Sequence, residues 1–226
     1  NVSCLIFKLY NVIGTNTHKI GYGYSNFDVL TGHTNIFDGS SDSLLIDHTT
    51  FNDLEHHLIS NTPKELLIIT NLDDKMYEKI KRAAGFGDIL IKKYDMNDER
   101  TKKCFKPEYI KNIIGTTFTN SEYFNEFEYC ELATSSLCFL IDYVNIYSPL
   151  ALKKISDPSL IDSERLILAN HTHQQLNIIE NNSVSLNKKS KLSSVLSNLN
   201  NCLSSLGKRN FKNQLLNPTR NKDKLN

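Results

Sequence analysis

The apolar positions at the start of the chain follow the alternating pattern of β-strands. Strand-like segments lie at residues 3–10, 19–28 and 34–37, and Leu30 to His33 supplies a turn before the third segment. Consecutive strands with so little chain between them can only pair in antiparallel fashion. The pattern therefore predicts an antiparallel meander.

Helical and strand-like patterns then alternate. A helix is expected over residues 49–60, and the apolar run at 65–70 is typical of a buried strand. A second helix over 73–84, closed by Gly85, leads to a further strand at 89–91. A meander followed by strands alternating with helices predicts an α/β layer with a mixed sheet.

The middle of the chain is expected to become helical. Residues 94–106 carry mixed charges without a clear period, and a short helical turn runs from Pro107 to near Gly115. A long helix with a broad apolar stripe is predicted over 121–147, ended by the proline at position 149.

A domain boundary is placed at this proline, which divides residues 1–150 from residues 151–226. In the second part, helices are expected over 166–180 and 191–216, with a polar linker between them. A helix pair that exposes so much leucine needs other helices to bury it, so we expect the chain to be cut from a longer protein.

Composition favours an intracellular protein from a reducing compartment. Five cysteines without paired spacing argue against a disulfide framework and against a zinc site. No apolar run approaches the roughly 18 residues of a membrane span, and no secretory signal is visible.

The net charge of +1 conceals an asymmetry between the two parts. Residues 1–150 hold 14 Lys and Arg against 20 Asp and Glu, whereas residues 151–226 hold 12 against 5. A basic segment rich in Ser and Asn can meet phosphates, and it can equally be a solvated helix face.

The last segment carries a family resemblance. Residues 194–218 are similar, without a gap, to the signature at the start of the MutS core domain. Upstream, Leu168 to Ile178 resembles a second stretch of that family, with Ala169, Gln175 and Asn177 as departures from it. The positions that fall in register are Thr172, Leu176, Ser194, Leu196, Leu199, Gly207, Arg209, Leu215, Leu216 and Pro218.

The first part agrees with this resemblance. Phe27 to Gly32 is similar to a hairpin of the MutS connector domain, and Leu132 to Tyr143 resembles the helix that closes it. The resemblance implies an RNase H-like α/β connector at 1–150, followed by the first helices of an all-α core domain at 151–226. The chain is expected to be a divergent member, of a viral or organellar branch.

What the resemblance implies about function is a non-catalytic fragment of a mismatch repair ATPase. Such a fragment links mismatched-DNA binding to the ATPase and clamp domains, and the parent protein dimerises with a second MutS chain on mismatched duplex DNA. No phosphate-binding Gly-x-x-x-x-Gly-Lys-[Ser/Thr] loop occurs, so ATP and magnesium belong elsewhere in the parent protein. No cofactor, catalytic residue or metal ligand is expected here.

Basic side chains near the end are the candidate DNA contacts. These are Lys208, Arg209, Lys212 and Arg220. In the family this helix lies away from the duplex, which favours a structural ion pair for Arg209. Gly207 is expected in the middle of a helix, where another backbone passes close.

Two alternatives remain open: an RNase H-like metal-dependent nuclease and a stand-alone nucleic-acid-binding module. The nuclease would use Asp28 with other carboxylates to hold two metal ions, although Asp28 is better interpreted as a turn former. Its candidate partners are Asp38, Asp42, Asp73 and Asp142.

Other motifs have plainer interpretations. Phe124 and Glu126 match the mismatch-reading Phe-x-Glu motif, but Phe124 lies on the apolar face of the predicted long helix, where core packing is favoured. The pairs His56-His57 and His171-x-His173 are expected to be surface imidazoles, because no third metal ligand lies at suitable spacing. Cys202 is interpreted as a buried thiol.

Overall fold

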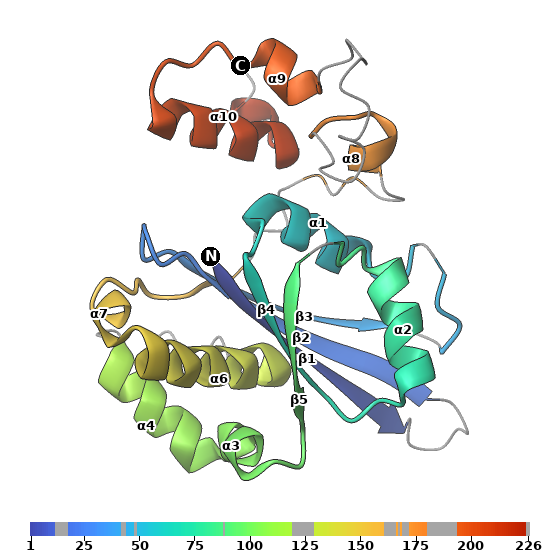
Figure 1. The fold of residues 1–226 in the computed structure, drawn as a ribbon, viewed down its shortest axis with the longest axis vertical. Helices are drawn as coiled ribbons and strands as arrows, with labels where there is room; N and C mark the ends of the chain where they lie inside the picture. Colours follow the sequence, from blue (N-terminus) through green and yellow to red (C-terminus); the bar gives the residue numbers. More distant parts are fainter. Residues whose placement is uncertain are drawn as a thin grey trace. The chain divides into compact units, whose positions relative to one another are not determined.

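The chain folds into two compact units, shown as a ribbon in Figure 1. The first comprises residues 1–51 and 61–161, and the second comprises residues 52–60 and 162–226. The computed structural model describes residues 1–11, 18–41, 44–47, 49–87, 89–118, 129–160, 166, 168, 172–179 and 194–224.

A six-stranded mixed sheet forms the centre of the first unit, in the order β5-β4-β1-β2-β3-β6. Antiparallel pairing joins β1, β2 and β3, whereas β4 runs parallel to β1 and β5 parallel to β4. The strands are β1 Val2–Asn11, β2 His18–Phe27, β3 Thr34–Ser41, β4 Glu65–Thr70, β5 Leu90–Asp95 and β6 Ser159–Leu160.

An antiparallel meander of three strands, with β4 added in parallel beside β1 and β5 in parallel beside β4, is the RNase H-like arrangement. The expected fold class is therefore confirmed, as is the meander itself. The run at 65–70 forms β4 with the predicted bounds.

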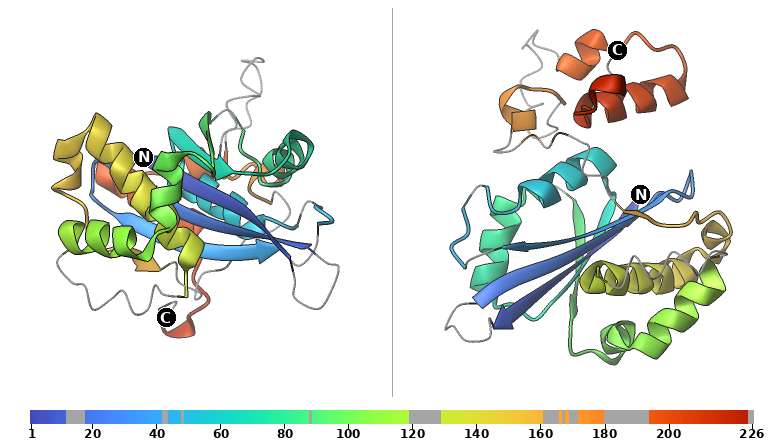
Figure 2. Two further views of the ribbon diagram at one scale, coloured as in Figure 1. Left: turned by 90° about the horizontal axis from the view of Figure 1, so that it is seen from below. Right: turned by 180° about the vertical axis from the view of Figure 1, so that it is seen from behind.

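Helices cover both faces of this sheet, as Figures 1 and 2 show for α6 and α2. Cys4 and Ile6 of β1 belong to the core beneath α6. Phe7 points to the other face of the sheet, where its ring centroid lies 6.1 Å from that of Phe51. The helices of this unit are α2 Asp74–Ala83, α3 Glu99–Lys102, the 3-10 turn η1 Lys103–Phe105, α4 Pro107–Thr117, α6 Glu131–Tyr147 and α7 Pro149–Leu152.

Glycines set how closely α6 approaches the sheet. A Cβ atom on Gly23 of β2 would collide with the backbone of Leu132 and Ala133 in the first turn of α6. The helix can therefore lie directly on β2 only because this strand position has no side chain.

The regular elements in the described part of the second unit are helices. They are α1 Asn52–Asn61, whose last residue is assigned to the first unit, α8 Thr172–Gln175, α9 Val195–Leu199, α10 Ser205–Leu216 and the 3-10 turn η4 Lys222–Lys224. The helix predicted over 166–180 was too long, because α8 spans one turn and neither Leu166 nor Leu168 is helical.

The single helix predicted over 191–216 was also wrong. Residues 200–204 separate α9 from α10, because the Asn200 side chain accepts a hydrogen bond from the backbone N–H of Cys202. Ser204 then caps α10 by accepting from the N–H of Gly207 at 3.0 Å.

Two further corrections concern the first unit. The irregular stretch 94–106 contains the end of β5, α3 and η1, because the hydroxyl of Thr101 donates to the backbone oxygens of Asp95 and Asp98 and fixes the turn. The long helix begins at Glu131 and not at 121; residues 129 and 130 are not helical, and 121–128 lie outside the described residues.

The first unit continues past Pro149. Pairing of β6 with β3 ties residues 159–160 to the sheet, and the unit extends to residue 161. The assignment of residues 1–150 to a connector and 151–226 to a core domain stays a prediction.

Candidate functional site

The four candidate DNA contacts lie on α10 and just after it. Lys212 is a surface neighbour of both Lys208 and Arg209, because it follows them by four and three residues on the helix. Lys208, Arg209 and Arg220 are exposed, and Lys212 is half-buried. The helix therefore presents three cations within its first two turns.

The electrostatic character of this surface is uniform. The described segment 194–224 holds six Lys and Arg residues and a single acid, Asp223. The partial positive charge of the α10 N-terminus adds to the cations of its first turns. An extended anion such as a phosphate backbone suits this surface.

The side chain of Arg209 is exposed. Its assignment to a structural ion pair stays a prediction. Assignment of the four basic residues to DNA contact stays a prediction.

Gly207 was predicted to lie in the middle of a helix, and this prediction is wrong. It lies in the first turn of α10, and a Cβ atom there would lie 3.0 Å from the Ser204 hydroxyl and 3.3 Å from the Cys202 Cβ. Among the described residues, the closest neighbours of this position therefore belong to the preceding loop.

The remaining signature positions are spread over the second unit. Thr172 begins α8, and its backbone oxygen accepts from the N–H of Leu176, which is 60% exposed. Leu199 ends α9 and is 56% exposed. The backbone oxygen of Pro218 accepts a hydrogen bond from the N–H of Leu166. This bond joins the chain after α10 to the residue at position 166, ahead of α8.

Asp28 is a turn former, as the sequence indicated. Its Oδ1 accepts from the backbone N–H of Leu30 at 2.9 Å and of Thr31 at 3.4 Å. Gly32 closes the same turn with a φ of +81° and donates its N–H to the Asp28 backbone oxygen. Asp28 follows β2, and β1 carries no acidic residue.

The other candidate carboxylates have separate structural partners. Asp38 on β3 accepts from the N–H groups of Leu132 and Ala133, and Asp73 accepts from the N–H of Met76 at the start of α2. Asp142 pairs with the ammonium of Lys103 at 2.5 Å. Asp42 lies outside the described residues.

These carboxylates do not converge. Within the described ranges, no three His, Cys, Asp or Glu side chains are grouped so that they could hold a metal ion. Burial raises the pKa of Asp38 to about 6, although the two N–H groups that it caps oppose this shift. The arrangement is that of a buried helix cap.

The histidines contradict the surface interpretation. His56, His57 and His173 are 1%, 8% and 3% exposed, and the rings of His56 on α1 and His173 on α8 contact each other. His171 lies outside the described residues, as do Phe124 and Glu126. Sequence spacing gave no signal for this cluster, since His56 and His173 are far apart along the chain.

Three of the cysteines, Cys4, Cys104 and Cys138, are buried in the core of the first unit. Burial raises the pKa of Cys4, Cys104 and Cys138, which keeps these three thiols protonated and poorly nucleophilic. Cys202 was predicted to be a buried helical thiol, but it is half-buried and lies in the loop between α9 and α10.

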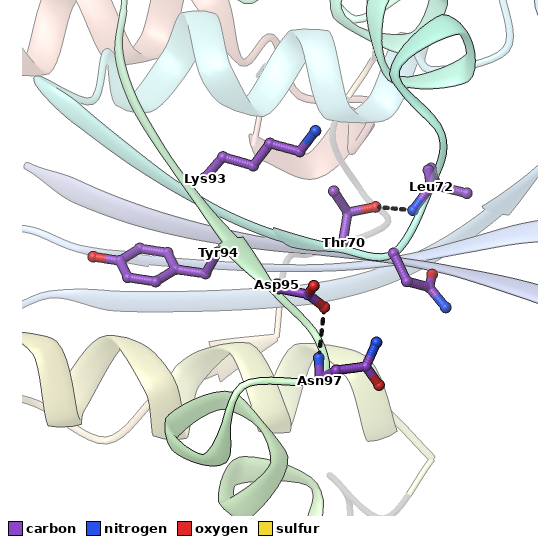
Figure 3. A pocket seen from close by; sticks show the side chains of 7 residues that line it. Thr70, Leu72, Lys93, Tyr94, Asp95 and Asn97 are labelled. Atoms are coloured by element: carbon purple, nitrogen blue, oxygen red, sulfur yellow. Dashed lines mark hydrogen bonds between the residues drawn. The ribbon is translucent and has the colours of Figure 1, made fainter.

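A crevice of about 420 Å³ opens at the carboxyl ends of the parallel strands β4 and β5. Figure 3 shows Thr70 and Asp95 at these strand ends, with Tyr94 directed away from them. The crevice is lined by Thr70, Asn71, Leu72, Lys93, Tyr94, Asp95 and Asn97.

Three polar side chains of this crevice, Thr70, Lys93 and Asp95, have partners within the protein. Asp95 Oδ1 accepts from the N–H of Asn97 at 2.7 Å, and the Lys93 ammonium lies 3.0 Å from Asp74 Oδ1. The carboxyl edge of parallel strands is a common place for ligands in α/β folds. Sequence analysis missed this crevice because residues 94–106 were not recognised as a strand end followed by a helix.

None of the helices in the described regions has the length and apolar character needed to cross a bilayer.

Comparison with known proteins gives one informative similarity. No family model matches the chain. Two structures of the Fowlpox virus Holliday junction resolvase, one with junction DNA, are 11% and 12% identical with TM-scores of 0.35, over 64% and 63% of this chain and 99% of each resolvase. Likeness at this level carries no argument about function.

The informative relative is a protein of Acanthamoeba polyphaga mimivirus that is described as a DNA mismatch repair protein and MutS homolog. It is 32% identical over 139 residues, which are 61% of this chain. The chain spans 11% of the length of that viral protein.

Proposed function

We propose that the chain is a non-catalytic part of a MutS-type mismatch repair ATPase, linking mismatched-DNA binding to the ATPase and clamp domains. The observation that carries this proposal is the 32% identity to the mimivirus MutS homolog. ATP, magnesium and the second MutS chain of a dimer would then be bound through other parts of the parent protein.

The geometry of the carboxylates supports a non-catalytic role. Two-metal nucleases need several carboxylates around one point. Asp28, Asp38 and Asp142 are instead used by a turn, a helix cap and an ion pair. These three carboxylates therefore have separate structural partners, which supports a non-catalytic role.

The start of α10 is the DNA contact proposed for this chain, which differs from the family resemblance, where this helix lies away from the duplex. Lys208 and Arg209 are exposed there, at the positive end of a twelve-residue helix. The contact is expected to be made to phosphates and to be independent of base sequence.

A cleavage assay separates this proposal from the nuclease alternative. The full chain is incubated with Mg²⁺ and labelled mismatched duplex, RNA–DNA hybrid or four-way junction. No turnover is expected. Magnesium-dependent cleavage that is lost in Asp28→Asn and kept in the matched surface variant Asp223→Asn would overturn the non-catalytic account.

A further inference from the structure

A histidine pair joins three distant segments of the second unit. His56 Nδ1 on α1 lies 3.4 Å from His173 Nε2 on α8, and the two ring centroids are 5.5 Å apart. His56 Nε2 lies 2.9 Å from Asn217 Oδ1, just after α10. One imidazole therefore connects α1 to both parts of the C-terminal segment, defined here as residues 172–179 and 194–224.

The hydrogen bonds determine where the protons sit. The Asn217 amide nitrogen donates to the backbone oxygen and Oδ1 of Asn213, which directs the Asn217 Oδ1 toward His56. His56 must then donate from Nε2, so its Nδ1 accepts from the N–H of His173 Nε2. Both rings are neutral in this arrangement.

An added proton would have no favourable place in the pair. Protonation of His56 at Nδ1 would turn two N–H groups toward each other. Protonation of His173 at Nδ1 would bury a charged N–H, and among the described residues this buried atom has no hydrogen-bond partner.

The surroundings offer limited compensation. Asp53 and Glu55 on α1 favour a charged His56, but burial outweighs them and lowers its pKa. His57 lies beside His56, and its own pKa is lowered to about 3, first by burial and then by His56. The described residues of α8 and of 194–224 bring one carboxylate, Asp223, which lies in the exposed turn η4.

We propose that His56 and His173 form an acid-sensitive latch that holds the C-terminal segment on α1 at neutral pH and releases it when the pair is protonated. The basis is geometric: a buried neutral pair, a fixed proton arrangement and an orphaned ring nitrogen. This device goes beyond the proposed role in DNA repair and does not depend on it.

The direction of the pH effect follows from linkage. Burial, and then His56, lowers the pKa of His173 to about 4, whereas a released imidazole keeps its ordinary value near 6.5. Between these two values the released state binds more protons than the latched state. The latch is therefore at full strength above pH 6.5 and weakens as the pH falls toward 4.

Hydrogen exchange on the full chain tests the latch. After correction for intrinsic exchange rates, protection of α8 and α10 amides should fall by about 30-fold from pH 7.5 to pH 5, while β1 and β4 amides stay protected. His173→Gln should remove most of this loss, because a glutamine amide can rotate to accept from protonated His56. His33→Gln, which changes an exposed histidine, should keep the full loss.

Two results would overturn the proposal. One is equal protection of α8 and α10 at pH 7.5 and pH 5 in the unaltered chain. The other is a His173 ring resonance that titrates near 6.5 in the folded chain, a measurement that needs no variant. A His173 midpoint near 4, together with the protection loss, supports the latch even where His173→Gln fails to hold the segment at neutral pH.

Discussion

The carboxylate of Asp38 on β3 and the backbone N–H of Ala133 in the first turn of α6 are joined by a hydrogen bond of 2.5 Å. The second oxygen of Asp38 accepts from the N–H of Leu132 at 3.2 Å. Cys130, at the N-cap position of α6, makes no side-chain cap hydrogen bond. A residue 95 positions earlier in the chain thus supplies the cap that the local sequence lacks.

Removal of this cap should destabilise the first unit. Asp38→Ala leaves two backbone N–H groups at the start of α6 without an acceptor, so the free energy of unfolding should fall by about 1–2 kcal/mol. Urea denaturation followed by circular dichroism measures the change. The matched control is Asp98→Ala at the start of α3, where the side chain makes no cap hydrogen bond. In this control the free energy of unfolding should fall by only a small fraction of the loss in Asp38→Ala. Equal losses in the two variants would contradict the assigned role.

The same carboxylate predicts a pH dependence. Burial raises the pKa of Asp38 from 3.8 to about 6, so the folded protein binds more protons than the unfolded protein between these values. The contribution of Asp38 is therefore fully present below pH 3.8 and decreases as the pH rises through 6. The stability difference between the unaltered chain and Asp38→Ala should be larger at pH 4 than at pH 7. A difference that grows with pH would show that the hydrogen bonds, and not burial, determine the pKa.

Close packing of α6 on β2 predicts a severe effect at Gly23. In Gly23→Ala the new methyl group meets the backbone of Leu132 and Ala133, so we expect a loss of about 1–3 kcal/mol or more. In Gly115→Ala the new Cβ in α4 would have no described atom within 4 Å apart from its chain neighbours and its own helix backbone. This variant should gain about 0.5–1 kcal/mol from reduced backbone freedom. Thermal unfolding should show a lower melting temperature for Gly23→Ala and a higher one for Gly115→Ala. An unchanged melting temperature in Gly23→Ala would show that α6 does not lie directly on β2.

Two buried serines should respond in opposite ways. Ser3 contacts the Tyr24 hydroxyl and the Asn26 Oδ1, both at 2.9 Å, so Ser3→Ala should cost about 1–2 kcal/mol. Ser135 on α6 is fully buried, and its hydroxyl has no hydrogen-bond partner among the described residues, so Ser135→Ala should be neutral or stabilising. A large loss in Ser135→Ala, measured by the same urea titration, would reveal a partner for that hydroxyl.

Local sequence predicted the strands well where burial alone decides the pattern. The apolar residues Leu66 to Ile69 are buried, and the predicted and observed bounds of β4 agree. For β5 the prediction stopped at Ile91, because the edge of the sheet tolerates Lys92 and Lys93 in a strand. Periodicity cannot detect a strand whose charged side chains stay in solvent.

The helical part was predicted less well because its boundaries depend on side-chain hydrogen bonds. Asn200 and Ser204 interrupt what reads as a continuous leucine stripe. The histidine pair was missed for a different reason, since its members come from segments 117 residues apart. Of the candidate site, the sequence located the exposed cations of α10, whereas the Asp38 cap and the crevice beside Asp95 required the tertiary structure.

Fluorescence anisotropy measures whether the chain binds DNA through α10. The full chain should bind a labelled duplex with an affinity that falls as salt rises from about 50 to 200 mM. Lys208→Glu with Arg209→Glu should weaken binding by about tenfold or more and make the salt dependence shallower by about two charges. Lys75→Glu with Lys79→Glu on α2 makes the same charge change on exposed residues and should leave binding nearly unaltered. Equal losses in both double variants, or no binding at low salt, would contradict a DNA contact at α10.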